Sequence, residues 1–352
     1  MQRRFVYMAL ILMLFLSCEE YYRPAIDQVS GMLVIESLVT NDPKQNFVKL
    51  SVTDNFFDTN TKDTLINANV ELLEIGHEII PAIEESHGYF RFTKMPVPGL
   101  SYKLRISCQN DIYESDTVVM PPLPMIDTLY TEFKMEKTFR NDTYGPVTQI
   151  DIPVRQIYID APITSSLEYY RFNWRAILQW NYSPASAGGI PPPAIYGWLS
   201  VLNDGLFNLA GPKQHSVSGK VEKHPITYLA YDSKRYLWSS EQSGSGWILI
   251  LEQYGISKAS NDFHERLNNQ LSAEGSLFEP MLNQVYGNIH CVSDNSKIAL
   301  GYFAVNSYRQ YRYFLNLGYD EKSEMIQRQI FRYPDIPQYG EQAGVIPYFW
   351  EN

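Results

Sequence analysis

The sequence predicts a mainly β protein: an N-terminal immunoglobulin-like β-sandwich followed by a larger β-rich domain with one or two helices. Short segments of alternating apolar and polar residues recur between turn signals through the first 120 residues. Three prolines within residues 121–124 then interrupt the chain. Apolar side chains at four-residue spacing stand out after residue 257. With 45% hydrophobic and 19% charged residues, the 352-residue chain can bury a core, which excludes a disordered protein.

The N-terminus has the pattern of a secretory signal peptide. Arg3 and Arg4 precede an uncharged, apolar run at 5–16, which is too short to cross about 30 Å of hydrocarbon as a helix. Ser17, a small residue, comes directly before Cys18. We therefore expect residues 1–17 to be removed as a signal peptide.

Cys18 lies where a bacterial lipobox has its acylated cysteine, although Phe15 stands where leucine is usual. Acylation of Cys18 would anchor the mature chain stably, since several acyl chains hold a protein where one does not. The alternative is an ordinary signal peptide whose cysteine pairs or stays free. Residues 18–30 are then a tether. Its Glu19-Glu20 pair resembles a surface-export signal, so we expect an outer-membrane location facing the exterior, with the periplasmic face as the alternative.

Residues 31–120 form the predicted immunoglobulin-like sandwich. Tyr102, Leu104 and Ile106 show the period-two alternation that predicts a half-buried strand. Glu84 and Glu85 fall in a segment interpreted as a polar loop. The expected strands cover residues 32–39, 47–53, 68–73, 88–92, 102–106 and 111–119.

Residues 121–125 form a stiff Pro-rich linker, and residues 126–352 form the predicted β-rich C-terminal domain. Strands are expected over 147–159, 169–180, 247–254, 297–305 and 308–317. The strand at 169–180 alternates Tyr170, Phe172 and Trp174 against Arg171, Asn173 and Arg175. A helix is expected over 261–271, capped by Ser257 or Ser260 and ended by Gly275.

No grouping of residues predicts a cofactor, a metal or a catalytic centre. The six histidines form no metal-binding pair, and His264 is expected on a solvated helix face. The acidic balance, 39 acidic against 29 basic residues, argues against binding nucleic acid. An envelope hydrolase acting on glycan or peptide stays open as an alternative because carboxylate pairs occur at Glu71/Glu74, Glu84/Glu85 and Glu132/Glu136.

Cys108 and Cys291 lie in different predicted domains. Two buried thiols are the favoured interpretation, and an inter-domain disulfide is the alternative. Aromatic residues gather around a Pro-rich loop. They predict either a contact surface for a small molecule, peptide or glycan, or simply the aromatic core of a β-sheet. These candidate contact residues are Trp174, Trp180, Tyr182, Tyr196 and Trp198.

Several segments together resemble a Bacteroidota outer-membrane lipoprotein family, the domain of unknown function 4249. They are residues 32–40, 48–51, 67–70, 88–89, 98–104, 277–280, 285–289 and 300–303. Within them, the family motif residues Gly287, Asn288, Gly301, Tyr302 and Phe303 are expected to be structural.

The resemblance implies no catalytic residue. It implies a non-enzymatic accessory of a TonB-dependent nutrient receptor. A structural or adhesive envelope protein is a further alternative.

Overall fold

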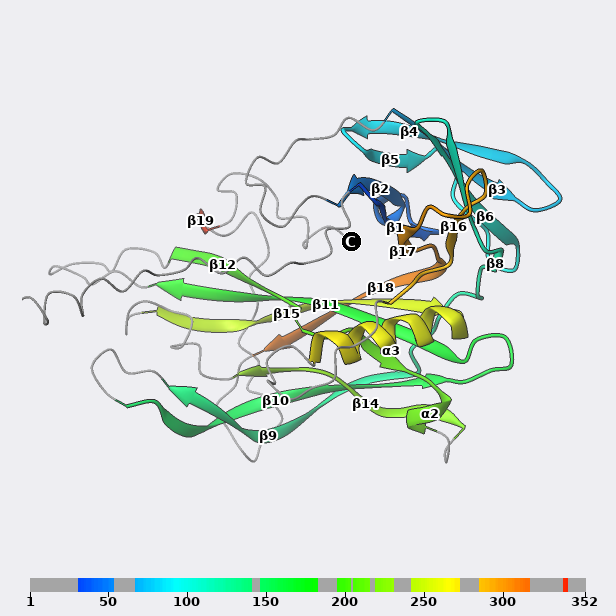
Figure 1. Cartoon of the computed structure of the whole chain (residues 1–352). Helices are drawn as coiled ribbons and strands as arrows, with labels where there is room; N and C mark the ends of the chain where they lie inside the picture. The colour runs from blue at the N-terminus through cyan, green and yellow to red at the C-terminus, as the bar shows by residue number, and fades with distance from the viewer. Residues whose placement is uncertain are drawn as a thin grey trace, which may run out of the picture.

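The computed structural model describes residues 31–53, 67–140, 146–182, 195–203, 205–215, 219–230, 242–272, 285–316 and 338–340. Strands make up most of these residues, so the prediction of a mainly β protein is confirmed (Figure 1). The predicted signal peptide, the tether and Gly275 lie outside the described residues. Among those that are described, no helix has the length and apolar character needed to cross a bilayer.

The N-terminal unit folds two sheets around one core. Strand β4 pairs with both β3 and β5, so it continues from one sheet into the other. Strand β6 alternates buried and half-buried residues along its whole length, as its sequence pattern predicts. The strands are β1 (Leu33–Thr40), β2 (Phe47–Val52), β3 (Ala68–Glu74), β4 (Ile79–Ser86), β5 (Tyr89–Phe92), β6 (Ser101–Cys108), β7 (Asp111–Ser115) and β8 (Val118–Val119), with a 3-10 turn η1 (Pro43–Gln45) after β1.

Glu84 and Glu85 belong to strand β4, so the prediction of a loop there is wrong. Ile80 is the buried residue of this strand, and Pro81 interrupts its alternation. Pairing with β3 and β5 on its two sides, rather than apolar periodicity, keeps the segment extended.

Strands from late in the chain complete the N-terminal unit. β16 (Ile289–Cys291) pairs with β7, and β17 (Ala299–Tyr302) pairs in parallel with β1. Buried residues from β16, from β17 and the residue directly after it, and from the start of β18 (Val305–Asn316) join the N-terminal core: Ile289, Cys291, Ala299, Phe303 and Val305. The predicted division at 121–125 assigns this segment to the C-terminal domain, whereas the structure packs it with the N-terminal one. The immunoglobulin-like type of the sandwich stays a prediction.

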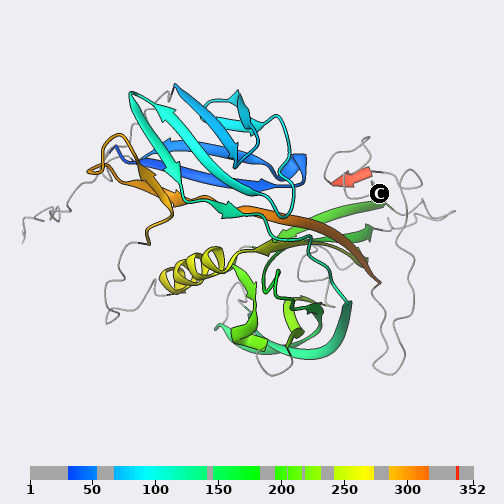
Figure 2. The same ribbon diagram turned by 90° about the vertical axis from the view of Figure 1, so that its right-hand side faces the viewer.

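The C-terminal unit packs a long-stranded sheet against a smaller one (Figure 2). The larger sheet has the order β18-β15-β11-β12-β19, and the smaller one has the order β14-β10-β9. The elements are β9 (Thr128–Arg140), β10 (Thr148–Pro162), β11 (Tyr169–Tyr182), β12 (Ile195–Leu202), β13 (Asn208–Ala210), α2 (Pro212–His215), β14 (Lys220–Ala230), β15 (Gln242–Ile256), α3 (Lys258–Ser272), β18 (Val305–Asn316) and β19 (Gln338–Gly340).

The aromatic face of β11 turns inward, toward the smaller sheet. Tyr170 and Phe172 are buried in the core between the two sheets, and Trp174 packs against it. Since side chains alternate along a strand, this leaves Arg171, Asn173 and Arg175 on the opposite face, which is turned toward the N-terminal unit.

The Pro-rich linker is bound along the larger sheet. Ser307 Oγ donates to the carbonyl of Pro122 at 2.6 Å, and Gln253 Nε2 donates to that of Met125 at 3.0 Å. Strand β18 also pairs with β1 at Val39 and Val305 before it pairs with β15. The linker and β18 therefore fix the two units relative to each other.

The predicted helix is confirmed as α3. Ser257 is its N-cap, since the Ser257 Oγ accepts the Ser260 amide at 3.2 Å. The expectation for His264 is wrong, because its side chain is buried against Phe207 and Phe263 rather than solvated. The thiols of Cys108 and Cys291 are free and buried, as the favoured interpretation predicts.

Candidate functional site

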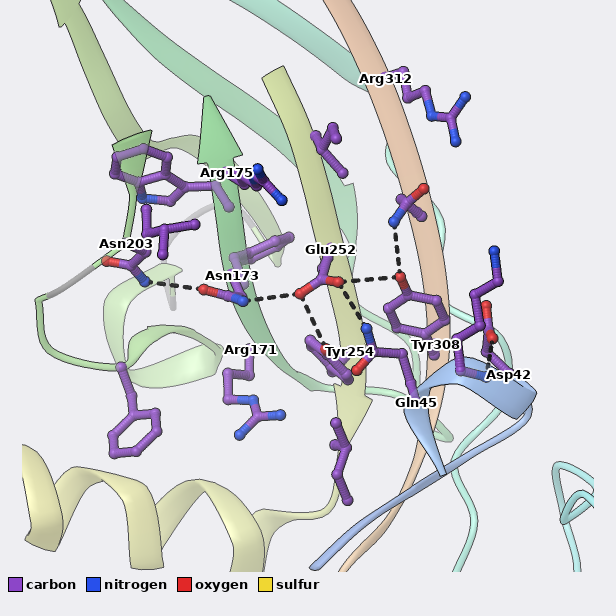
Figure 3. Close-up of a pocket in the computed structure, with 18 of the residues that line it drawn as sticks. Asp42, Gln45, Arg171, Asn173, Arg175, Asn203, Glu252, Tyr254, Tyr308 and Arg312 are labelled. Carbon is purple, nitrogen blue, oxygen red and sulfur yellow. Dashed lines mark hydrogen bonds between the residues drawn. The ribbon is translucent and has the colours of Figure 1, made fainter. Parts of the chain in front are cut away.

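A cleft of about 900 Å³ lies between the N-terminal unit and the larger C-terminal sheet (Figure 3). Turn η1 and Leu38 of β1 border it on one side, and Leu202 at the end of β12 borders it on the other together with Asn203 and residues 205–207. Its floor is the face of β11, β15 and β18 that the C-terminal core leaves unused.

Strand register sets the floor side chains in three cross-strand rows. In antiparallel sheets, directly opposed residues point to the same face, so each row contributes three neighbouring side chains. The rows are Arg171–Tyr254–Tyr308, Asn173–Glu252–Gln310 and Arg175–Ile250–Arg312.

Glu252 is the centre of this grid and accepts four hydrogen bonds. Its Oε1 accepts from Gln45 Nε2 at 3.0 Å and from the Tyr308 hydroxyl at 3.3 Å. Its Oε2 accepts from Asn173 Nδ2 at 2.8 Å and from the Tyr254 hydroxyl at 3.2 Å. A carboxylate has about four acceptor positions, so these bonds use its capacity.

The two tyrosines of the network act as donors. Burial, followed by the nearby Glu252 carboxylate, raises the pKa of Tyr254 and of Tyr308 well above the usual value. Both hydroxyls therefore keep their protons at neutral pH. The network holds the side chains of the cleft floor in place and also connects the floor to η1 through Gln45.

Arg171 is held at the end of the floor that lies near α3. Its guanidinium stacks over the Tyr254 ring at 4.4 Å, and its Nη1 lies 3.2 Å from His264 Nε2. Burial lowers the pKa of His264 to about 4, with a further contribution from Arg171, so the imidazole is neutral. Since His264 Nδ1 lies 2.7 Å from the carbonyl of Ser260, the ring proton belongs on Nδ1, and Nε2 accepts from Arg171.

The charge of Arg171 has no carboxylate partner within salt-bridge distance among the described residues. Its Nε is buried and has no hydrogen-bond partner there either. Burial lowers the pKa of Arg171, which is the sign that the cation loses hydration at this position. The Arg171 side chain as a whole is half-buried, and its Nε is enclosed. A partly desolvated cation without a paired anion is costly, so this position favours an anion.

Two further cations of the lining are also unpaired. Arg312 and Lys44 have no side-chain hydrogen bond or ion pair with any part of the chain that the structure describes, whereas Arg175 Nη2 donates to Ser200 Oγ at 2.7 Å. The lining thus has four cationic side chains against the two carboxylates of Asp42 and Glu252. In a chain with net charge −10, this local excess of positive charge is distinctive.

Of the five predicted contact aromatics, Trp174 lines the cleft. Trp180 and Tyr182 lie farther along β11, while Tyr196 and Trp198 lie on the paired strand β12, opposite Asn181 and Gln179. The structure therefore sets these residues on two adjacent strands. The side chains of those four residues lie outside the described part of the structure.

The family motif residues lie away from the cleft floor, where the returning strands meet β1. Asn288 Nδ2 donates to the carbonyl of Phe303, and Asn288 Oδ1 accepts the Phe303 amide. Phe303 is fully buried in the N-terminal core. Tyr302 stacks on Phe263 of α3 with ring centroids 4.5 Å apart. Gly287 and Gly301 occupy points of close backbone approach.

The predicted carboxylate pairs do not line the cleft. Glu74 accepts from the Tyr102 hydroxyl, and Glu132 forms an ion pair with Lys223 at 2.7 Å. Within the described ranges, no group of three or more His, Cys, Asp or Glu side chains is arranged to hold a metal. Cys18 lies outside those ranges.

Sequence reasoning missed Glu252 as a site residue. The sequence does contain a sign of its role. Glu252 directly follows the apolar run Trp247–Leu251 of a buried strand, where a charge without a partner would be costly. The alternation of Arg171, Asn173 and Arg175 is a second signal. Both identify one polar face, but neither indicates that η1 covers it.

Comparison with known families gives one finding. The model of the family described as Domain of unknown function (DUF4249) matches residues 19–312. A comparison with curated proteins finds no match.

Proposed function

We propose that this chain, which belongs to the DUF4249 family, is a non-enzymatic outer-membrane lipoprotein. In this proposal it faces the cell exterior, binds a ligand in the cleft and assists a TonB-dependent nutrient receptor. The observation that carries the proposal is the cleft, whose polar floor is held in place by hydrogen bonds before any ligand arrives. Preorganised concave sites with a few fixed polar groups are typical of ligand binding.

The state of Glu252 favours binding over catalysis. A general acid or base must exchange a proton with substrate, yet four donors already use this carboxylate. Asp42, the other carboxylate of the lining, accepts the Lys44 amide at 2.8 Å and so stabilises η1. Both carboxylates are therefore engaged in holding the cleft walls. The hydrolase alternative is less well supported for this reason.

The N-terminal segment supports the membrane attachment. A short apolar run ending at Ser17-Cys18 has the features that precede acylation, and acyl chains on Cys18 would hold the mature chain at the membrane. The sandwich that follows the tether would then serve as a spacer or docking module, and it would position the cleft away from the bilayer.

Metabolic labelling with palmitate tests the anchor. The wild-type chain is expected to take up label and to stay with the membrane fraction, whereas Cys18→Ala is expected to lose both. Cys108→Ala is the matched control, because its buried thiol lies inside the N-terminal core and is not a lipid acceptor in this proposal. Unchanged labelling of Cys18→Ala would refute the anchor.

Co-purification in mild detergent tests the accessory role. We expect the anchored wild-type chain to bring down a TonB-dependent receptor, identified by mass spectrometry. Recovery of no such receptor from cells that carry the anchored protein would count against the accessory role. Loss of growth on one nutrient after gene deletion would favour transport over a structural or adhesive function.

A further inference from the structure

We propose that the ligand of the cleft is a small organic polyanion, with at least two carboxylate or phosphate groups. One group would bind between Arg175 and Arg312, and a second would bind at Arg171. This inference rests on the proposed function in one respect, since it takes the cleft to be a ligand site. The following observations identify the ligand chemistry.

The charge of the lining is the first observation. Arg171, Arg175, Arg312 and Lys44 outnumber the two carboxylates, and the acceptor positions of Glu252 are already used by four uncharged donors. An acidic chain has no compositional reason to gather cations here. Like charges gathered on one face of a sheet repel one another unless an anion lies between them.

The unpaired state of two cations is the second observation. Arg312 has five N–H donors and no partner in the described part of the chain, and the buried Nε of Arg171 is also unmatched. Each position offers donors that a carboxylate or phosphate oxygen can accept. A neutral ligand would add no anion at Arg171, whose guanidinium has no carboxylate within salt-bridge distance among the described residues.

The spacing of the arginines is the third observation. Arg175 and Arg312 flank Ile250 in one row, so their backbones are about 10 Å apart. Arg175 Nη2 donates to Ser200 Oγ of β12, so binding one oxyanion together with Arg312 would require the long Arg175 side chain to turn from Ser200 toward β18. Arg171 lies four residues from Arg175 along β11, which is about 14 Å. In Figure 3, Arg175 and Arg312 lie on one side of Glu252 and Arg171 lies on the other.

The size of the cleft limits the ligand to a small molecule. About 900 Å³ is within the range of pockets that enclose drug-sized compounds. Two anionic groups separated by the spacing of the arginine sites fit this volume. The row between the two ends is Asn173–Glu252–Gln310, so the part of the ligand that joins its two anionic groups lies over polar side chains.

Calorimetric titration of the full chain in detergent tests the proposal. The probes are linear α,ω-dicarboxylates from adipate to dodecanedioate, and the corresponding alkane-α,ω-diol bisphosphates. The monocarboxylates and monophosphates of equal length are the matched controls. Wild-type protein is expected to bind a doubly charged probe about tenfold or more tightly than its singly charged control. The series that binds more tightly identifies the anion as carboxylate or phosphate.

Two substitutions on one strand locate the binding. Arg312→Gln is expected to remove the advantage of the doubly charged probe, a loss of about tenfold or more. Arg309→Gln is the matched control, since Arg309 lies on the same strand, opposes Gln253 and does not line the cleft. Its affinity for both probes is expected to equal that of wild type.

Three results would overturn the inference. They are the absence of saturable binding by any doubly charged probe, equal affinity for singly and doubly charged probes, and equal weakening by Arg309→Gln and Arg312→Gln. The proposed function is tested separately by labelling and co-purification. If wild type brings down a receptor but binds no polyanion, the inference fails and the accessory role stands. The reverse pattern would refute the accessory role alone.

Discussion

Gly287 and Gly301 lie where three backbone segments approach too closely for a side chain. A Cβ atom at Gly287 would lie 1.6 Å from the carbonyl oxygen of Gly301, and one at Gly301 would lie 1.9 Å from that of Ile35. Gly301 also has φ +110°, which other residues rarely adopt. These glycines allow the returning segment to pack against β1.

We expect Gly301→Ala to lower the free energy of unfolding by about 3 kcal/mol or more, because backbone must move to admit the methyl group. Urea denaturation measures the change. Gly205→Ala is the control, since its Cβ would meet only Asn203 Oδ1 at 3.6 Å and its φ is not positive. A loss of equal size in both variants would contradict this account of the close approach.

His224 and His264 give the protein a pH-dependent stability. Burial lowers the pKa of each to about 4, with added repulsion from His215 and Arg171 respectively, against 6.5 for an ordinary histidine. The unfolded chain therefore binds protons below about pH 6.5, and the folded chain does so only below about pH 4. Their contribution to stability is complete above pH 6.5 and is lost as the pH falls from 6.5 to 4.

At pH 5, each histidine is expected to reduce the free energy of unfolding by about 2 kcal/mol relative to pH 7. Denaturant unfolding of His224→Gln should show a change in the free energy of unfolding between pH 7 and pH 5 that is smaller than the wild-type change by that amount. His87→Gln, which replaces an exposed histidine, should behave as wild type. If the free energy of unfolding of His224→Gln differs between pH 5 and pH 7 by as much as that of wild type, burial of neutral His224 is not the source of the pH dependence.

At the scale of elements, α3 depends on its first turn. Ser257 Oγ accepts the Ser260 amide, and a hydrogen bond between the side chains of Ser257 and Tyr302 connects the cap to the returning segment. Tyr302 also stacks on Phe263. The cap therefore fixes both the start of the helix and its position beside the cleft, where His264 meets Arg171.

Ser257→Ala is expected to lower the free energy of unfolding by about 1 kcal/mol, the usual cost of an N-cap. Thermal or denaturant unfolding measures it. Ser257→Thr keeps a hydroxyl acceptor and should retain most of the stability. Equal destabilisation by alanine and threonine would indicate that packing around Ser257, rather than the cap hydrogen bond, determines the effect.

Elements with strong local patterns could be predicted, and those without them could not. Strand β6 buries every second residue, so its alternation suffices to predict it. Helix α3 has Phe263, Leu267 and Leu271 at four-residue spacing, and this pattern predicts the helix although only Phe263 of the three is buried. Strand β4 has charged residues and Pro81 in place of an alternation, and its pairing partners make it a strand. His264 was expected in solvent because the sequence does not show that the segment with Phe207 covers that side of the helix.

At the scale of the whole molecule, the two units share the segment 285–306. Its buried residues complete the N-terminal core, and β18 then continues into the C-terminal sheet. Residues 31–120 alone lack this part of their core. We infer that the N-terminal unit is not an autonomous domain.

We expect a fragment of residues 31–120 to lack cooperative unfolding and to bind a dye that reports exposed apolar surface. Joining residues 285–306 to it by a flexible linker should restore a cooperative transition in denaturant. The same joined segment with Phe303→Asp serves as the control, because Phe303 is fully buried in this core. Cooperative unfolding of the shorter fragment by itself would contradict the shared core.

The mainly β class, most strands, helix α3 and the polar face of β11 can be predicted from local patterns, because each depends on residues a few positions apart. Which segments meet depends instead on contacts between residues far apart in the chain. Gln45 and Glu252 are 207 residues apart and hydrogen-bond across the cleft, and Arg175 and Arg312 share a row through β15. Alternation along a strand fixes the face on which a side chain lies. The order of the strands in the sheet and the packing of the N-terminal unit on it fix which side chains are neighbours, and those neighbours form the cleft.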